Sequence, residues 1–311
     1  MSSSLKAAII AGAIGGICFI SAAPALAQAQ RPPEDSILAW APKPAEATPW
    51  VAPHKPHWKL ADVLAKHKGE KNWSETIVND KDFTAKYISM QPGEKTKKML
   101  YADSRIFWVV QDGQIRFSIE GQEPFIATSG FLVQVPYRTP FSMETIGKKP
   151  SLRFEVTQSG VLPFYTADET PTPVTGTNYV KVAYRGHGEY DDVNKPYLDF
   201  KGDIAAGGKP RGPFVKDDKT FANIIRGEGM PLPPPTNLGH FHTDYNEFWF
   251  IMEGQIDYLI EGQEVFSAHE GDIVLAPQGR FHRASWGGEG MATRLAINPR
   301  PAGMHNYEPP H

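Results

Sequence analysis

Three residues in the C-terminal third of the chain have the types and the spacing of a metal site. His240 and His242 stand one residue apart, and Glu247 follows across the polar, turn-prone segment "TDYN". Residues i and i+2 of a β-strand point to the same face, so both imidazoles should enter one space, and a reversal at "TDYN" should bring the carboxylate to them. Neutral imidazole and ionised carboxylate suit a divalent first-row metal ion. The alternative is that all three are ordinary surface residues beside a hairpin.

An internal repeat predicts the elements that position these side chains. The segment "FWVVQDGQIRFSIEGQEPFIATSGFLVQVP" at 107–136 aligns without a gap with "FWFIMEGQIDYLIEGQEVFSAHEGDIVLAP" at 248–277, at a constant offset of 248 − 107 = 141. Each copy consists of short apolar runs separated by turn signals, which is typical of an all-β sandwich or barrel. The chain is therefore expected to carry two copies of one β-domain.

A fourth candidate ligand follows the second copy. His282 lies five residues after Pro277, on the strand expected next. The same region contains glycines at Gly254, Gly271 and Gly279. This combined spacing of histidines, glutamate, glycines and proline resembles the two motifs of the cupin superfamily. The resemblance covers both β-domains, but neither the N-terminal segment nor the one between the domains. At two positions that hold no ligand the sequence departs from the motifs, with Pro234 in place of a glycine and Trp286 in place of an asparagine.

The resemblance implies an all-β bicupin with two tandem jelly-roll barrels. The proline-rich segment before them is expected to form an extended N-terminal arm. The resemblance assigns His240, His242, Glu247 and His282 as ligands of one divalent transition-metal ion. Manganese, iron, copper, nickel and zinc all suit these ligands, so the identity of the metal stays open.

The N-terminal copy is expected to lack a metal. Subtracting 141 from the four ligand positions gives Met99, Tyr101, Ile106 and Phe141. None of these is a good ligand for a hard or borderline divalent ion. We expect this domain to be structural, or to hold a dry pocket for an apolar molecule.

Five segments are expected along the chain. They are a signal peptide at 1–27, a Pro/Trp-rich arm at 28–58, an N-terminal cupin domain without metal ligands at 59–156, a linker or insertion at 157–219, and a C-terminal metal-binding cupin domain at 220–311.

The first segment has the layout of a secretory signal peptide. An apolar run too short to span a bilayer leads into "SAAPALA", which predicts cleavage after Ala27. The mature protein is then periplasmic or secreted, with no membrane contact. Cys18, the only cysteine, leaves with the signal, so the mature chain forms no disulfide. A net charge of −3 without a basic block argues against nucleic acid as a partner.

The arm contains Trp40, Trp50 and Trp58, which are too apolar for a free tail. We expect them to pack on the body of the protein or on a neighbouring subunit, and we expect a homo-oligomer. The segment "WKLADVLAKHKG" after the arm predicts one short helix, and "YVKVAYR" at 179–185 predicts a strand within the insertion.

The ligand set predicts a reactive centre that acts on a small-molecule substrate. Three neutral imidazoles and one carboxylate leave a single net positive charge on a divalent ion, and five- or six-fold coordination leaves a position open. Such a centre can polarise a substrate oxygen or bring substrate and dioxygen together. Glu247 could also accept a proton from a bound hydroxyl, which makes it the candidate catalytic base.

Substrate contacts are expected from the same strands. Alternation puts Trp249 on the face of Glu247, and Arg280 and Trp286 on the face of His282. The tryptophans could wall an aromatic substrate, and Arg280 could hold a carboxylate or phenolate. The alternative for the tryptophans is ordinary core packing.

Three functions stay open at this point. The favoured one is a metal-dependent dioxygenase acting on a small, for example phenolic, substrate, since the ligand set resembles that of the flavonol-cleaving bicupins. The second is a lyase, decarboxylase or isomerase of a small organic acid or sugar, although the similar oxalate-decarboxylating bicupins carry metal in both halves. The third is a non-catalytic cupin that binds a small molecule. Oxygen consumption separates the first from the second, and any turnover separates both from the third.

Overall fold

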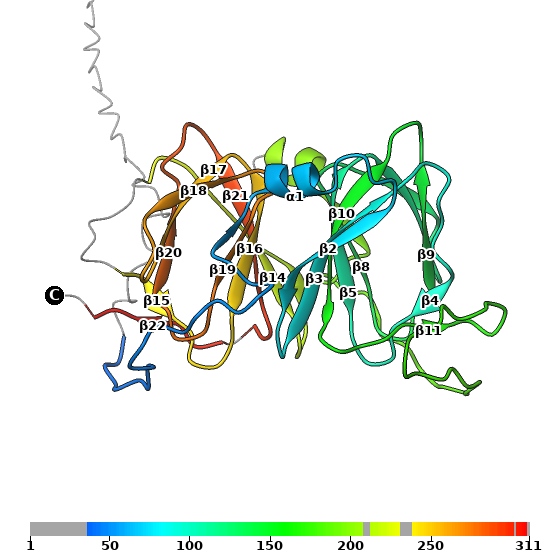
Figure 1. Ribbon diagram of the computed structural model, residues 1–311, viewed down its shortest axis with the longest axis horizontal. Coiled ribbons are helices and arrows are strands. Elements are labelled where there is room, and N and C mark those ends of the chain that lie inside the picture. The colour runs from blue at the N-terminus through cyan, green and yellow to red at the C-terminus, as the bar shows by residue number, and fades with distance from the viewer. Residues whose placement is uncertain (1–35, 208–211, 231–237, 302, 310–311) are drawn as a thin grey trace, which may run out of the picture.

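The computed structural model describes residues 36–207, 212–230, 238–301 and 303–309, and it consists of two β-barrels side by side (Figure 1). The fold class predicted from the sequence, two tandem jelly-roll barrels, is confirmed. The signal peptide expected at 1–27, the start of the arm and Pro234 lie outside the described residues. No helix in the described part of the chain is long and apolar enough to span a membrane.

The N-terminal barrel consists of two antiparallel sheets. The six-stranded sheet has the order β12-β8-β5-β10-β3-β2 and the five-stranded sheet the order β11-β4-β9-β6-β7. Their bounds are β2 (Trp73–Asn79), β3 (Phe83–Met90), β4 (Met99–Leu100), β5 (Ile106–Asp112), β6 (Gln114–Ile119), β7 (Phe125–Thr128), β8 (Phe131–Val135), β9 (Phe141–Ile146), β10 (Ser151–Gln158), β11 (Phe164–Tyr165) and β12 (Tyr197–Asp199).

The C-terminal barrel has the same architecture. Its six-stranded sheet has the order β1-β19-β16-β21-β14-β13 and its five-stranded sheet the order β18-β17-β20-β15-β22. Their bounds are β1 (His57–Trp58), β13 (Gly212–Lys216), β14 (Phe221–Gly227), β15 (His240–Phe241), β16 (Glu247–Glu253), β17 (Gln255–Ile260), β18 (Phe266–His269), β19 (Ile273–Ala276), β20 (His282–Ser285), β21 (Ala292–Asn298) and β22 (Asn306–Tyr307).

The repeat seen in the sequence continues in the strands. β5, β6 and β7 match β16, β17 and β18 residue for residue at the offset of 141, and β4 matches β15 in the same way. The match therefore extends beyond the segments that align by sequence, to the strands that carry His240 and its counterpart Met99.

The largest apolar cluster lies between the barrels, where the two six-stranded sheets face each other (Figure 1). Alternation in β16 sends Phe248 and Phe250 to this interface, while Trp249 and Ile251 point into the barrel. Across the interface the ring centroids of Phe250 and Phe154 are 5.4 Å apart. Full burial of each such side chain stabilises the fold by roughly 1.5–3 kcal/mol.

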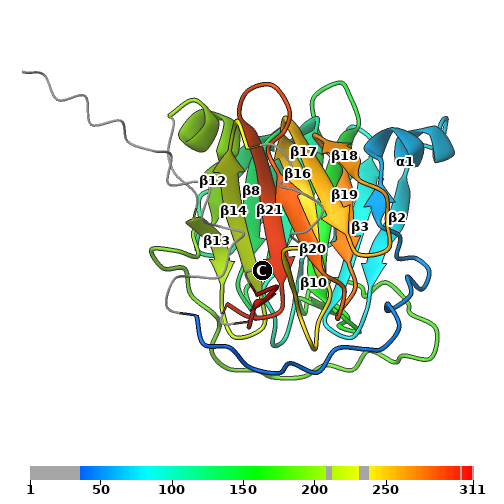
Figure 2. The same cartoon turned by 90° about the vertical axis from the view of Figure 1, so that its left-hand side faces the viewer.

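The arm packs on the C-terminal barrel of its own chain. In Figure 2 it runs in blue along the bottom of the molecule towards α1 (Leu60–Lys66), the short helix predicted from the sequence. β1 pairs with β19, and Trp50 and Trp58 pack against the buried core. Trp40, in contrast, is fully exposed in the isolated chain. Two of the three arm tryptophans thus contact the body of the protein, as expected.

The insertion at 157–219 supplies edge strands to both barrels. β12 pairs with β8 of the N-terminal barrel, the π-helix η1 (Phe200–Ala205) follows it, and β13 pairs with β14 of the C-terminal barrel. The strand predicted at 179–185 is wrong. Alternation along a segment makes a strand only if a free sheet edge accepts it, and here Val180, Val182 and Tyr184 are instead exposed.

Candidate metal centre

Three short stretches of the C-terminal barrel bring the four predicted ligands together. In the antiparallel pair of β15 and β20, His240 lies directly opposite His282. His242 follows the end of β15, and Glu247 is the first residue of β16. The close approach of β15 to β20 requires glycine at Gly239, which has a φ of +87° and where a side chain would collide with the carbonyl oxygen of His282.

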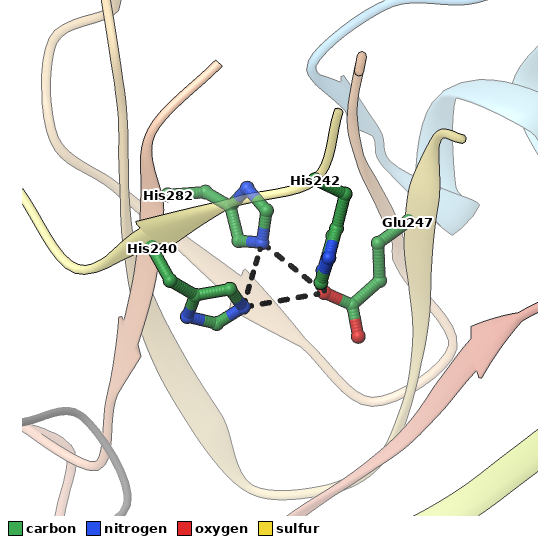
Figure 3. Close-up of side chains that lie close together, drawn as sticks. All are labelled: His240, His242, Glu247 and His282. Atoms are coloured by element: carbon green, nitrogen blue, oxygen red, sulfur yellow. Dashed lines mark hydrogen bonds and ion pairs between the residues drawn. The ribbon is translucent and has the colours of Figure 1, made fainter. Parts of the chain in front are cut away.

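The four side chains converge on one point (Figure 3), and their ligand atoms all lie within 4.8 Å of one another. The Nε2 atoms of His242 and His282 are each 3.1 Å from Oε2 of Glu247, and Nε2 of His240 is 3.8 Å from it. The side chains of His242, Glu247 and His282 are 1%, 6% and 2% exposed, whereas that of His240 is 13% exposed. The cluster is therefore open to solvent on the side of His240.

Backbone carbonyl groups fix the tautomers of two of the histidines. Nδ1 of His242 lies 2.9 Å from the carbonyl oxygen of Met304, and Nδ1 of His282 lies 3.0 Å from that of Arg280. A carbonyl only accepts hydrogen bonds, so both Nδ1 atoms carry the proton. In the neutral rings the Nε2 lone pairs then point at Glu247, which is the arrangement typical of metal-binding histidines.

Burial sets the charge states of the cluster. It lowers the pKa of His282, with attraction to the charge of Glu247 opposing the shift in part. It also lowers the pKa of His240 well below the ordinary value, aided by repulsion from His282. Burial alone would raise the pKa of Glu247, but its close contacts with the three histidines outweigh burial, so that pKa lies well below its ordinary range. At neutral pH the cluster thus offers the neutral imidazoles of His240 and His282 and an ionised carboxylate.

This donor set fits one divalent metal ion. In the neutral form of the rings, the Nε2 lone pairs of His242 and His282 face a carboxylate oxygen with no hydrogen atom between them. A cation at the point where they meet satisfies all of these acceptors at once, and nitrogen and oxygen ligands of this kind suit a divalent transition metal. Among the residues that the structure describes, this is the one group of three or more His, Cys, Asp or Glu side chains that could hold an ion.

The corresponding point of the N-terminal barrel is apolar. Met99 pairs with Phe141 in the β-ladder between β4 and β9. The rings of Tyr101 and Phe141 are stacked at 6.5 Å, and Ile106 and Phe141 are buried in the barrel core. Side chains thus replace the metal site in this barrel, as the offset of the repeat predicts.

The structure places the three predicted substrate contacts in different surroundings. Trp249 lies inside the barrel with its ring 5.2 Å from that of His282. Trp286 is also buried inside the barrel, where its Nε1 donates a hydrogen bond to the carbonyl oxygen of Ala292. Both tryptophans therefore form part of the core, and Trp249 also contacts a ligand.

Arg280 is held by the arm. Its guanidinium group donates hydrogen bonds to the carbonyl oxygens of Thr48 and Glu261, and it stacks on Trp50 at 4.0 Å from the ring centroid. Because β20 begins only at His282, strand alternation does not apply to Arg280, and the structure does not bring its guanidinium to the ligands. A substrate contact by Arg280 stays a prediction, and it requires these contacts with the arm to break.

Three residues that the sequence did not identify also lie at the cluster. The ring of His305 lies 4.6 Å from that of His240 and 4.9 Å from that of His242. Tyr245 stacks on His242 at 4.3 Å. Asn298 donates a hydrogen bond to Oε1 of Glu247 at 3.4 Å. The ligand motifs contain no signal for His305, because it follows the last strand of the repeat.

Comparison with known proteins gives a consistent result. A family model described as "Cupin domain" matches residues 232–298. The structure is similar to a Cupin 2 conserved barrel domain protein of Leptotrichia buccalis, with a TM-score of 0.52 and 13% identity over 78% of this chain and 96% of that one. It is also similar to a mutant of the oxalate decarboxylase of Bacillus subtilis, with a TM-score of 0.51 and 13% identity over 85% and 81% of the two chains. No curated protein matches the chain. At this identity the similarity to solved structures establishes the fold alone.

Proposed function

We propose that the chain is a cupin and that it is an exported, metal-dependent enzyme that acts on a small organic molecule. The reaction that we favour is of the dioxygenase type. A bound divalent transition metal supplies a Lewis acid for a substrate oxygen and, where it is redox-active, a path for electrons to dioxygen.

The observation that carries this proposal is the arrangement of the two oxygens of Glu247. Oε2 faces the three imidazoles, whereas Oε1 is directed away from them, towards Asn298 (Figure 3). One carboxylate can therefore hold the ion with one oxygen and accept a proton from a substrate hydroxyl with the other. The low pKa of Glu247 keeps the group ionised at neutral pH, which is the form that can accept a proton.

The surroundings of Glu247 support proton transfer in a site with little water. The side chains of His242 and His282 are almost fully buried, and Trp249 closes the site from inside the barrel. Electrostatic interactions are stronger in such a water-poor environment. Solvent and substrate are expected to enter on the side of His240 and His305.

A second candidate is a metal-dependent lyase, decarboxylase or isomerase of a small organic acid. It is favoured by one specific observation, namely that Arg300 lies beside a small cavity that Glu247 also lines. A guanidinium group in this position suits a carboxylate better than a neutral phenol.

Oxygen dependence distinguishes the two candidates. The metal-loaded mature protein should be incubated with panels of phenols and of small organic acids, in air and under argon, while substrate loss and oxygen uptake are measured. Turnover coupled to oxygen uptake supports the dioxygenase. If turnover is equally fast under argon, the dioxygenase assignment is rejected in favour of a lyase or isomerase. Binding without turnover would identify a non-catalytic cupin.

We also propose that the mature protein is a periplasmic or secreted homo-oligomer. Ile37, Leu38 and Trp40 of the arm and Val180 and Val182 of the insertion expose apolar side chains in the isolated chain, which marks these segments as candidate subunit contacts. Light scattering on the purified mature protein tests the oligomer. Cell fractionation and N-terminal sequencing test export and cleavage after Ala27.

A further inference from the structure

A small cavity adjoins Glu247 and extends between β14, β16 and β21. Its volume is about 110 Å³. This is well below the roughly 300–1,000 Å³ of pockets that hold drug-sized ligands, so it suits a molecule of only a few heavy atoms. The apolar part of its lining comes from Phe221, Ile225, Ala296 and Pro301.

Two of the residues that line this cavity each have a buried polar atom without a partner. The hydroxyl of Tyr245 and the Oδ1 atom of Asn298 make no hydrogen bond within the described part of the chain. Tyr245 is 1% exposed and Asn298 5% exposed. Leaving buried polar groups unpaired costs free energy, so such groups call for an explanation. At this position the simplest explanation is a ligand that accepts a hydrogen bond from Tyr245 and donates one to Asn298.

A positive charge stands at the edge of the same cavity. The guanidinium group of Arg300 pairs with Asp244 through Nη2 at 2.8 Å and lies 5.7 Å from the centre of the Tyr245 ring. Its side chain is 48% exposed, and its remaining N–H groups are available to a second anion. The cavity is therefore bordered by a cation at one point and by the ionised Glu247 at another.

We propose that this cavity is the subsite for the organic substrate and that it takes a small hydroxycarboxylate. Arg300 and Tyr245 hold the carboxylate, because both donate hydrogen bonds. Asn298 accepts the hydrogen bond of the hydroxyl, which places that hydroxyl on the side of Glu247, since the amide of Asn298 also contacts Oε1. Phe221, Ile225 and Ala296 surround the carbon atoms. The assignment rests on the proposed function and specifies its substrate class.

Calorimetric binding to the metal-loaded protein tests this assignment without any need for turnover. Lactate is the probe. Propionate, which lacks the hydroxyl group, and lactamide, which lacks the negative charge, are the control compounds. We expect lactate to bind at least tenfold more tightly than either control compound. Equal affinity for all three compounds, or no binding of lactate, overturns the proposal.

Substitutions locate the binding site. Arg300→Met and Tyr245→Phe should each weaken the binding of lactate by about tenfold or more, and the loss in Tyr245→Phe follows from a single missing hydroxyl. Asp244→Asn is the matched control, because it breaks the same ion pair but leaves the guanidinium in place, and it should bind lactate as well as the unsubstituted protein does. If Arg300→Met binds as well as Asp244→Asn, the subsite is wrong.

The outcomes separate this proposal from the proposed function. Binding of lactate that depends on Arg300, in a protein that turns over no organic acid or phenol, confirms the subsite and contradicts the enzyme. Turnover of a neutral phenol that is unchanged in Arg300→Met confirms an enzyme and contradicts the subsite.

Discussion

Nε2 of His242 lies 3.1 Å from Oε2 of Glu247, although both atoms are acceptors in the neutral ring and the ionised carboxylate. The tautomer follows from the contact of Nδ1 with the carbonyl oxygen of Met304, more than sixty residues away along the chain. The C-terminal segment thereby orients a ligand of the C-terminal barrel, and the facing lone pairs mark the position of a cation.

The first prediction concerns metal content. Fully loaded protein should hold about one transition-metal ion per chain, because the N-terminal barrel has Met99, Tyr101, Ile106 and Phe141 at the equivalent positions. His282→Ala should lose the ion while the barrels stay folded, whereas His187→Ala, whose Nδ1 contacts only the neighbouring Gly188 carbonyl, should retain it. Elemental analysis and circular dichroism measure both effects. Two tightly held ions per chain would contradict the assignment.

The second prediction follows from linkage between metal binding and folding. An ion that binds only the folded chain stabilises it by about 2.7 kcal/mol when its concentration is 100 times the dissociation constant. Metal should therefore raise the melting temperature of the unsubstituted protein and leave that of His240→Ala and of His242→Ala nearly unchanged. Scanning calorimetry with and without a chelator measures this. An equal rise in all three proteins would place the ion elsewhere.

The third prediction separates the two roles of Glu247. Glu247→Gln keeps an oxygen ligand but removes the base, so most of the metal should stay while turnover falls by roughly 10²–10⁴-fold. Metal analysis and steady-state kinetics on the same preparation distinguish the two roles. Full activity in Glu247→Gln would show that this residue is not the base.

The fourth prediction concerns the arm. Trp50 donates a hydrogen bond to the carbonyl oxygen of Leu275 at 3.1 Å and carries the guanidinium of Arg280 on its ring. Trp50→Ala should lower the free energy of unfolding by about 1–3 kcal/mol. Trp40→Ala, in the same arm but fully exposed in the isolated chain, should change it by less than about 0.5 kcal/mol if Trp40 contacts no second subunit. Urea titrations of both variants make the comparison, and a large effect of Trp40→Ala would point to a subunit contact.

The fifth prediction concerns the acid side of the stability curve. Asp272 accepts hydrogen bonds from His57 and from the backbone N–H groups of Leu60 and His269, which joins the arm and the start of α1 to β19. Burial alone would raise the pKa of Asp272, but these hydrogen bonds outweigh it and lower that pKa. The ionised group therefore stabilises the fold above the ordinary aspartate pKa, and this contribution is lost as the pH falls through the lower folded value.

Asp272→Asn removes this dependence on pH. The difference in unfolding free energy between the two proteins should be constant near neutral pH and should shrink on acidification below about pH 4. Urea titrations over that range measure it. A difference that grows on acidification would contradict the sign of the shift.

The sequence by itself determined the repeated β-domain, the four residues of the candidate metal cluster and the apolar side chains at the equivalent positions of the N-terminal barrel. These depend on strand alternation and on short turns, which fix the face of a side chain within a few residues. His240 and His242 converge because they lie two positions apart at the end of one strand, and Glu247 joins them because its strand begins one turn later.

Only the tertiary structure decided where distant segments meet. Arg280 donates a hydrogen bond to the carbonyl oxygen of Thr48, more than two hundred residues earlier in the chain. His305, which follows the last strand of the repeat, packs its ring against that of His240. The segment at 179–185 has a strand-like alternation but pairs with no sheet edge. In contrast, β12 and β13, which the sequence did not predict, pair with β8 and β14. Such contacts depend on which edges and surfaces the folded barrels leave open, and no local pattern in the chain carries that information.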